Sequence, residues 1–475
     1  MQDPDKDPSD QDPDDDDNDD LPDDWADQLM ANMNGIPGMD SSAMAAQMRQ
    51  FLDADGNIDM NKLMGGLRSA LGQAMAGSDP ASGMNWKNTT TAITRLVAAQ
   101  GKDPQPEPPT SEMLDAFSLA SLWLDQATVF DGSAMRLELW NRERWVKETM
   151  GAWQSIAAPI ASRLGDALID LITENLSGEG NPIAGLSGMT DMLAPMMRST
   201  AGEFYSARLS RAIADLAAAT LSGTDTALPV VQPPAIALLP RNIEEFTAGL
   251  VAPPTDTSVF LLMREIARQR LFNATPWLGP QLLALIEHYA REITIDPNTL
   301  REGFDVDQLD QLVPERLAEM SAQMEDRLFR PASTPEQQAI LSRLEVLISL
   351  VEGWVETVVS QAAAPWLASQ AALTETMQRR RAAGGPAEQA LKALLGLDLG
   401  SRRVREAANL WAAIGHDRGI EQRDAIWHHP DMLPQAEDLD DVLGYVAKTS
   451  ADAAPDAMDT QLNWLVDQWR KDSEA

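Results

Sequence analysis

The chain has no cysteine and only four histidines in 475 residues. The absence of cysteine excludes disulfide bonds, thiolate nucleophiles and every zinc or iron–sulfur centre that is built on cysteine. The absence of cysteine is also consistent with a protein that resides in a reducing compartment. The four histidines are His288, His416, His428 and His429, so few imidazoles are available to hold a metal ion.

Positive charge is scarce as well, with 37 Lys and Arg against 73 Asp and Glu and a formal net charge of −36. Thirteen Asp and one Lys within residues 1–24 account for a third of that charge. An acidic chain repels phosphate backbones, so we expect no binding of nucleic acid.

Long apolar runs are also missing from the sequence. No segment approaches 18 uncharged apolar residues, and we therefore expect no membrane-spanning helix. The N-terminus lacks the basic and apolar pattern of a secretory signal. Together with the lack of cysteine, these features predict a cytoplasmic protein.

Composition divides the chain into four segments. Residues 1–24 form an Asp-rich tail that cannot bury apolar surface and is predicted to be disordered. Residues 25–109 are rich in Met and Gly and end in a Pro-rich linker; we expect low order there, apart from a helix over 89–99. Residues 110–446 are predicted to form the compact domain, and 447–475 a helical C-terminal tail.

Within the compact domain, apolar residues recur at helical spacing almost throughout, which predicts a mainly α fold of many helices with little strand. The best strand signals, at 229–231 and 293–295, are too short for a large sheet. The predicted long helices span residues 141–175, 189–221, 257–272, 279–292, 335–362 and 402–414.

Two of these helices carry charged residues where burial is expected. The helix over 257–272 is apolar on nearly all sides, yet Arg264, Glu265 and Arg268 share one arc of it. Charges on a buried helix need partners. In the helix over 335–362, Glu352 lies at the edge of the apolar stripe, so we expect it to be half buried and to need a cation.

The stretch Arg264-Glu265-Ile266-Ala267-Arg268 and the runs Leu221-Ser222-Gly223-Thr224-Asp225, Gln269-Arg270-Leu271-Phe272 and Leu350-Val351-Glu352-Gly353-Trp354-Val355-Glu356 together resemble a bacterial family of zincin-like metallopeptidases, also described as hydrolases. In that family the first stretch is the HExxH helix. Its two histidines bind zinc and its glutamate serves as general base toward the bound water. The resemblance covers most of residues 110–446 and implies a zincin-like fold.

Transferred to this chain, the family pattern places the general base at Glu265 and the third metal ligand at Glu352. The two histidine positions hold Arg264 and Arg268. Arginine has no lone pair and stays protonated in proteins, so it does not ligate zinc. The resemblance thus implies zinc in the family, and we expect neither metal nor cofactor in this chain.

Two arrangements of the arginines are open at this point. In one, the two guanidiniums supply the +2 charge of the lost zinc and form a buried cluster with Glu265 and Glu352. In the other, Arg264 and Arg268 extend to the surface together with Glu265.

Other candidate sites are weaker. Arg379, Arg380 and Arg381 precede a Gly-rich turn, and Arg402 and Arg403 open the next helix; these arginines could hold an anion or an acidic partner, or form an ordinary solvated face. The adjacent His428 and His429 are predicted to lie in a structural turn, since no further ligand is suitably spaced. His288 is expected in the core or at its boundary.

These observations predict a zincin-like family member with a degenerate zinc site, a pseudoenzyme that acts by binding or scaffolding an unidentified protein or peptide partner. The alternative is an active metal-dependent peptidase or hydrolase that uses Glu265 as general base and Glu352 as a metal ligand. Ligation by oxygen alone would favour Mg, Ca or Mn over zinc.

Overall fold

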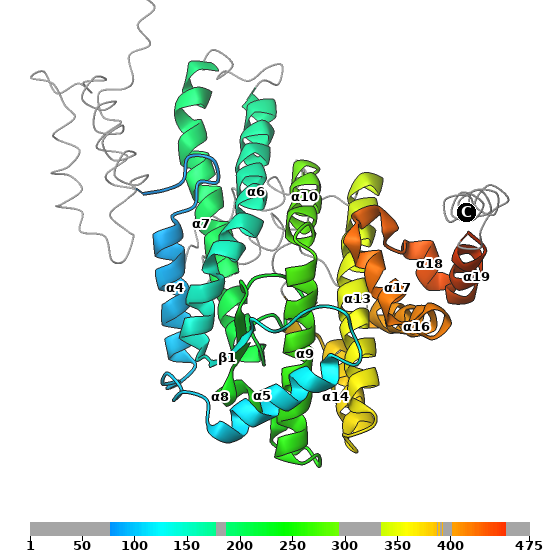
Figure 1. Cartoon of the computed structure of the whole chain (residues 1–475). Coiled ribbons are helices and arrows are strands. Elements are labelled where there is room, and N and C mark those ends of the chain that lie inside the picture. The colour runs from blue at the N-terminus through cyan, green and yellow to red at the C-terminus, as the bar shows by residue number, and fades with distance from the viewer. Residues whose placement is uncertain are drawn as a thin grey trace, which may run out of the picture. The chain divides into compact units, whose positions relative to one another are not determined.

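The computed structural model describes residues 77–176, 187–293, 334–386, 388, 389, 392 and 401–452 (Figure 1). The predicted tail at 1–24 and the first part of the 25–109 region lie outside these residues, as does the chain beyond 452. The described fold is mainly α-helical with little strand, as predicted. Its helices of eight or more residues are α4 (Trp86–Ala99), α5 (Ser111–Leu124), α6 (Arg142–Leu176), α7 (Ser187–Ala219), α8 (Pro240–Thr247), α9 (Pro254–Ala274), α10 (Leu278–Arg291), α13 (Pro335–Ala363), α14 (Gln370–Ala382), α16 (Ser401–Arg418) and α19 (Val442–Asp452).

The remaining elements are short. The C-terminal part of the described chain contains α17 (Ile420–Ala425), the single 3-10 turns Ile426–His428 and Pro430–Met432, and α18 (Ala436–Asp440). His428 and His429 thus fall in a turn region, as predicted. His288 is exposed on α10, so the prediction that it lies in the core or at the boundary of the core is wrong.

The compact unit begins at Gly77, earlier than the boundary expected at residue 110. The reason is that α4 belongs to the core. Asn85 caps this helix by accepting from the backbone N–H of Asn88, and Met84 and Ile93 are fully buried. The hydroxyls of Thr89 and Ser206 lie 2.7 Å apart and join α4 to α7.

The long helices match the predicted ranges to within three residues at most of their ends. Periodicity works here because each helix buries one apolar face or more against its neighbours. At the start of α13 the Thr334 hydroxyl accepts from the backbone N–H of Gln337, and the Gln337 side chain accepts from the backbone N–H of Thr334. The Gln337 amide also donates to the Glu292 carbonyl at 3.0 Å, so this capping box ties α13 to the end of α10.

The two described strands, β1 (Arg136–Leu139) and β2 (Ala235–Leu238), pair in parallel, with Arg136 opposite Ala235 and Leu139 opposite Leu238. The strand predicted at 229–231 is wrong: Val230 and Val231 are buried in a loop, so their apolar character reflects burial and not extended pairing. In the second predicted strand, Ile293 lies outside any strand and the rest falls outside the described residues.

The centre of the core is formed by α9 and α13. Nearly every residue of α9 from Val259 to Phe272 is buried, because α5, α13, α14 and β2 all pack against it. Figure 1 shows α5 crossing in front of α9, with α13 beside it. Within the described chain, α13 alone is long and apolar enough to cross a membrane, and most of its apolar stretch is buried inside the fold, as in a core helix of a soluble domain.

The contact of α13 with α16 depends on the small size of Gly353. A Cβ atom built on Gly353 would lie 2.6 Å from the backbone nitrogen of Ala408 and 2.7 Å from the Cβ of Ala407. We predict that Gly353→Ala lowers the free energy of unfolding by about 1–3 kcal/mol, because the two helices must separate.

A matched control is Gly151→Ala in α6, where an added Cβ would meet nothing within 4 Å. This change is expected to raise stability by about 0.5–1 kcal/mol, since alanine restricts the unfolded chain. Urea denaturation of both variants checks the pair. A loss of stability confined to Gly151→Ala would contradict the packing described for Gly353.

Candidate functional site

The candidate site begins with the loop 221–226, which follows α7 and is buried throughout. Ser222 forms an antiparallel bridge with Leu238, and the Gly223 N–H donates to the Ala237 carbonyl at 2.9 Å. These bonds hold the loop along the edge of β2. Gly223 approaches α9 so closely that a Cβ atom on it would lie 3.1 Å from a Glu265 carboxylate oxygen.

Glu265 is fully buried and points at this loop. The Thr224 backbone N–H lies 3.2 Å from each Glu265 carboxylate oxygen, and the Thr224 hydroxyl donates to Oε2 at 2.7 Å. The nearest guanidinium is that of Arg268, 3.7 Å away. The carboxylate at the predicted general-base position is therefore a hydrogen-bond acceptor that fastens the loop to α9.

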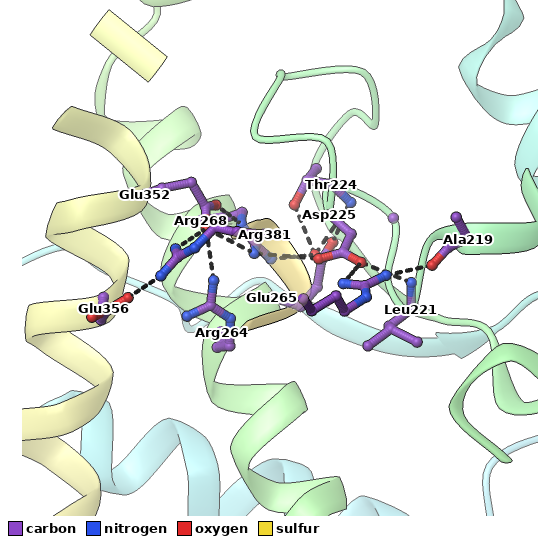
Figure 2. A network of polar contacts seen from close by, with 12 residues as sticks. Ala219, Leu221, Thr224, Asp225, Arg264, Glu265, Arg268, Glu352, Glu356 and Arg381 are labelled. Carbon is purple, nitrogen blue, oxygen red and sulfur yellow. Dashed lines mark hydrogen bonds and ion pairs between the residues drawn. The ribbon is translucent and has the colours of Figure 1, made fainter. Parts of the chain in front are cut away.

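Arg264 and Arg268 lie one turn apart on α9 and both contact Glu352 of α13 (Figure 2). Arg264 Nη2 is 2.7 Å from Glu352 Oε2, and Arg268 Nε is 2.6 Å from Glu352 Oε1. All three side chains are at most 5% exposed. The predicted buried pairing with Glu352 is present, whereas the predicted pairing with Glu265 is limited to Arg268, at 3.7 Å. The alternative in which the arginines reach the surface is wrong.

The network extends to α14, which supplies two further guanidiniums. Arg381 donates to Glu352 at 3.3 Å and, through its other terminal nitrogen, to Glu356. Arg380 donates to Asp225 at 2.9 Å and to the Ala219 carbonyl at the end of α7. Asp225 also lies 3.5 Å from Arg268, so it joins the two halves of the network.

We call these eight side chains the ion cluster. It contains four arginines and four carboxylates and so balances its charges when all are ionised; its members are Arg264, Arg268, Arg380, Arg381, Asp225, Glu265, Glu352 and Glu356. Removing a charge from water costs several kcal/mol unless opposite charges and hydrogen bonds offset that cost. Balance is thus the condition under which so many ions remain buried.

For the carboxyl groups of the cluster, burial raises the pKa and the nearby arginines lower it. Burial alone would raise the pKa of Glu352, but Arg268 and Arg264 hold it well below its usual range. The pKa of Asp225 is also lowered, because Arg380 and Arg268 outweigh the effect of burial. Burial raises the pKa of Glu265, for which Arg268 is the only strong opposing charge.

The two arginines that α9 contributes to the ion cluster also differ in pKa. Burial lowers the pKa of Arg264 to about 10 against the pull of Glu352, which still leaves it charged near neutral pH. Burial would also lower the pKa of Arg268, but Glu352 and Asp225 together raise it. Arg268 is therefore held as a cation more strongly than Arg264.

The donor set does not fit a zinc ion. The guanidiniums of Arg264 and Arg268, at the positions where the resemblance places histidines, offer no lone pair, and they donate to both oxygens of Glu352. Nowhere in the described ranges do three or more His, Asp or Glu side chains gather as a metal site would require. His288, His416, His428 and His429 are all exposed, whereas the cluster is buried.

Two sequence-based expectations need correction at α13 and α14. Glu352 is 4% exposed and not half buried, because three guanidiniums cover it. Arg379, Arg380 and Arg381 do not form one anion site: Arg379 pairs with Glu375 at the surface, while the other two point into the ion cluster.

Arg402 and Arg403, the other arginines of the predicted anion site, do not form a common site either. Arg403 pairs with Asp440 at 2.6 Å and with Glu406 at 3.1 Å. Arg402 lies in the first turn of α16, and its side chain falls outside the described residues. Arg403 thus neutralises carboxylates of its own chain and does not share a binding surface with the arginines of α14.

Sequence reasoning missed the roles of Thr224, Asp225, Glu356, Arg380 and Arg381. One signal could have pointed to them. Glu352 and Glu356 are four residues apart on one face of α13, and with Glu265 they make three carboxylates against the two charges of Arg264 and Arg268, which predicts a further cation nearby.

A family model described as zincin-like metallopeptidase matches residues 84–446 of the chain. A solved structure from Chloroflexus aurantiacus, described as a candidate hydrolase with a novel fold, aligns with a TM-score of 0.51 and 14% sequence identity. That alignment covers 77% of this chain and 99% of the other. At this identity the likeness extends to the fold alone. A search of curated proteins found no significant match.

The contribution of the ion cluster to stability can be tested at Glu352. We predict that Glu352→Gln lowers the free energy of unfolding by about 3–5 kcal/mol, because Arg264 and Arg268 lose the carboxylate that compensates their burial. The matched control is Glu375→Gln, which breaks the exposed pair with Arg379 and is expected to cost at most about 1 kcal/mol. Urea denaturation checks both; equal losses would contradict the buried pairing.

The lowered pKa of Glu352 also predicts a dependence on pH. Its pKa in the folded state lies below the ordinary value of 4.5, so its contribution to stability is present above that value and is lost as the pH falls toward the folded-state pKa. Asp225, whose pKa is also lowered, acts in the same sense, and Glu265, with its raised pKa, in the opposite one.

We therefore expect the stability difference between the parent chain and Glu352→Gln to shrink as the pH is lowered below about 4.5. Urea midpoints of the two proteins, measured between about pH 7 and about pH 3.5, provide the test. A difference that stays constant across this range would show that Glu352 is not held ionised by the arginines.

Proposed function

The chain belongs to the zincin-like metallopeptidase family, and we propose that it is a member in which an arginine–carboxylate cluster has taken the place of the zinc ion. In this proposal the protein is a non-catalytic binding or scaffold protein. The observation that carries it is the contact of both Arg264 and Arg268 with Glu352.

The first support is the charge of the arginines. Zinc brings a charge of +2 to a buried site, and two guanidiniums bring the same charge on side chains that extend from the histidine positions of α9. A chain that lost the histidines alone would keep Glu352 buried with Arg381 as its remaining cation, at 3.3 Å, which is destabilising. Arginine at both positions keeps the core balanced while the metal is lost.

The second support is the state of Glu265. A general base must reach the proton of a substrate or water within hydrogen-bond distance. Glu265 is fully buried, and its oxygens accept from the backbone N–H and hydroxyl of Thr224. Activating water at this carboxylate would require the loop 221–226 to leave α9. Guanidiniums also lack the Lewis acidity that lowers the pKa of a zinc-bound water.

The proposal predicts the metal content and activity of the protein. Protein purified without chelator is expected to contain zinc, manganese or calcium far below one ion per chain when measured by plasma mass spectrometry. Peptide hydrolysis is expected to be no higher for the parent chain than for Glu265→Gln. One bound metal ion per chain together with turnover that depends on Glu265 would instead establish an active metal-dependent hydrolase.

A second prediction tests whether the arginines stand at former ligand positions. In Arg264→His with Arg268→His, the two imidazoles and Glu352 recreate a set of three zinc ligands. We expect this double variant to be destabilised without metal and to gain about 2–3 kcal/mol of stability when zinc is present at about 100 times its dissociation constant. The melting temperature with and without zinc measures this gain.

The matched control is Arg264→Gln with Arg268→Gln, which removes the same charges but adds no metal ligand. Zinc should raise the melting temperature of the histidine variant and leave both the glutamine variant and the parent chain unchanged. A response to zinc of the same size in the histidine and glutamine variants would contradict the proposal. Because the readout is thermal stability, the test does not depend on recovering hydrolysis.

A further inference from the structure

On a different face of α13 from Glu352 and Glu356 lies an open pocket of about 400 Å³. One wall is formed by residues that share a face of α13: Ala339, Ser342, Arg343, Val346, Leu347 and Leu350. A second wall is formed by Trp277, Gln281 and Leu285 at the start of α10. The segment 430–437 forms the third. Figure 1 shows α10 and α13 side by side, and α18 also contacts α13.

The apolar part of the pocket is held in place by an aromatic stack. The Trp277 indole N–H donates to the Trp427 carbonyl at 3.0 Å, and its ring stacks on that of Trp427, which in turn stacks on Trp411. Trp277 is only partly buried, so part of its ring faces the pocket. Leu347 and Leu433, both nearly buried, complete an apolar floor.

The mouth of the pocket carries one charge of each sign. Arg343 and Glu437 are both exposed lining residues, and within the described residues neither side chain has an ion pair or hydrogen bond, with each other or with any other group. The neutral side chains of Gln281, Ser342 and Gln435 also line the pocket. This distribution distinguishes the pocket from the ion cluster, where every charge is already paired.

The two charges narrow the class of ligand. A simple anion would be repelled by Glu437 and a simple cation by Arg343, while a fully apolar ligand would use neither. A ligand that carries a carboxylate and an ammonium group beside an apolar side chain can pair with both charges and pack against the tryptophan and the apolar floor. The volume lies at the lower end of the range of roughly 300–1,000 Å³ that is typical of small-molecule sites.

We propose that this pocket binds a free α-amino acid with a large apolar side chain, of the phenylalanine or leucine kind. Its carboxylate pairs with Arg343, its ammonium group with Glu437, and its side chain lies against Trp277, Leu347 and Leu433. This inference is independent of the fate of the zinc site, since none of these residues belongs to the ion cluster.

The test is calorimetric titration of the full-length chain with L-phenylalanine, N-acetyl-phenylalanine and phenylalanine amide. We expect L-phenylalanine to bind, and each blocked analogue to bind about threefold to tenfold more weakly, as suits exposed charge pairs. Absence of phenylalanine binding at millimolar concentration would overturn the proposal. Equal binding of all three compounds would overturn the roles of the two charges.

Variants assign each charge to its partner group. Arg343→Gln should weaken binding of L-phenylalanine and remove the preference over phenylalanine amide, while keeping the preference over N-acetyl-phenylalanine. Glu437→Gln should do the reverse. Both positions are exposed, so neither change is expected to disturb folding. The matched control is Arg95→Gln on the exposed side of α4, which should leave all three affinities unchanged.

A final variant places the ligand in this pocket. Ser342 is exposed on the α13 wall, so Ser342→Trp fills the pocket without removing a buried side chain. It should abolish binding of L-phenylalanine at an unchanged melting temperature. Binding that persists in this variant would place the ligand elsewhere and refute the assignment.

Discussion

The Glu352 carboxylate on α13 holds three helices together, because Arg264 and Arg268 of α9 and Arg381 of α14 all donate to it. Each of these ions would be strongly destabilising if it were buried alone. The same is true of Asp225, which accepts from Arg380 and lies beside Arg268. The loop 221–226, the last turn of α14 and the centre of α9 therefore depend on one another electrostatically, in addition to their apolar packing. A change at one member leaves its partners buried with fewer opposing charges.

Much of this arrangement follows from spacing along the chain. Arg264 and Arg268 share a face of a helix that is otherwise apolar, so burial of that face requires acidic partners for them. Glu352 is also identifiable as a residue that needs a cation, since it is acidic at the edge of an apolar stripe, although its full burial is not predictable from that position. The long helices are equally predictable, because each shows a consistent apolar period. These patterns involve residues close together in the sequence. Such patterns predict the structure correctly where one face of a helix is buried.

What the sequence does not reveal are contacts between segments far apart in the chain. Arg380 and Arg381 lie in a run of arginines that resembles a solvated face, and only the docking of α14 brings them to Asp225 and Glu356. Thr224 is separated from Glu265 by forty-one residues, and the loop reaches it through pairing with β2. The strand expected at 229–231 is wrong for a related reason: its valines are apolar because they are buried, which a short run cannot distinguish from strand pairing.

The ion cluster and a zinc site solve the same electrostatic problem with different chemical consequences. Both neutralise a carboxylate from α13 at the centre of a helical core. A zinc ion keeps an open position for water and acts as a Lewis acid, whereas guanidiniums direct their N–H groups at fixed acceptors and leave no coordination position. In the function proposed above, this exchange preserves the fold and removes the reaction. Because the pocket beside Arg343 uses another face of α13, a binding role there does not depend on whether the ion cluster stands in for a zinc site.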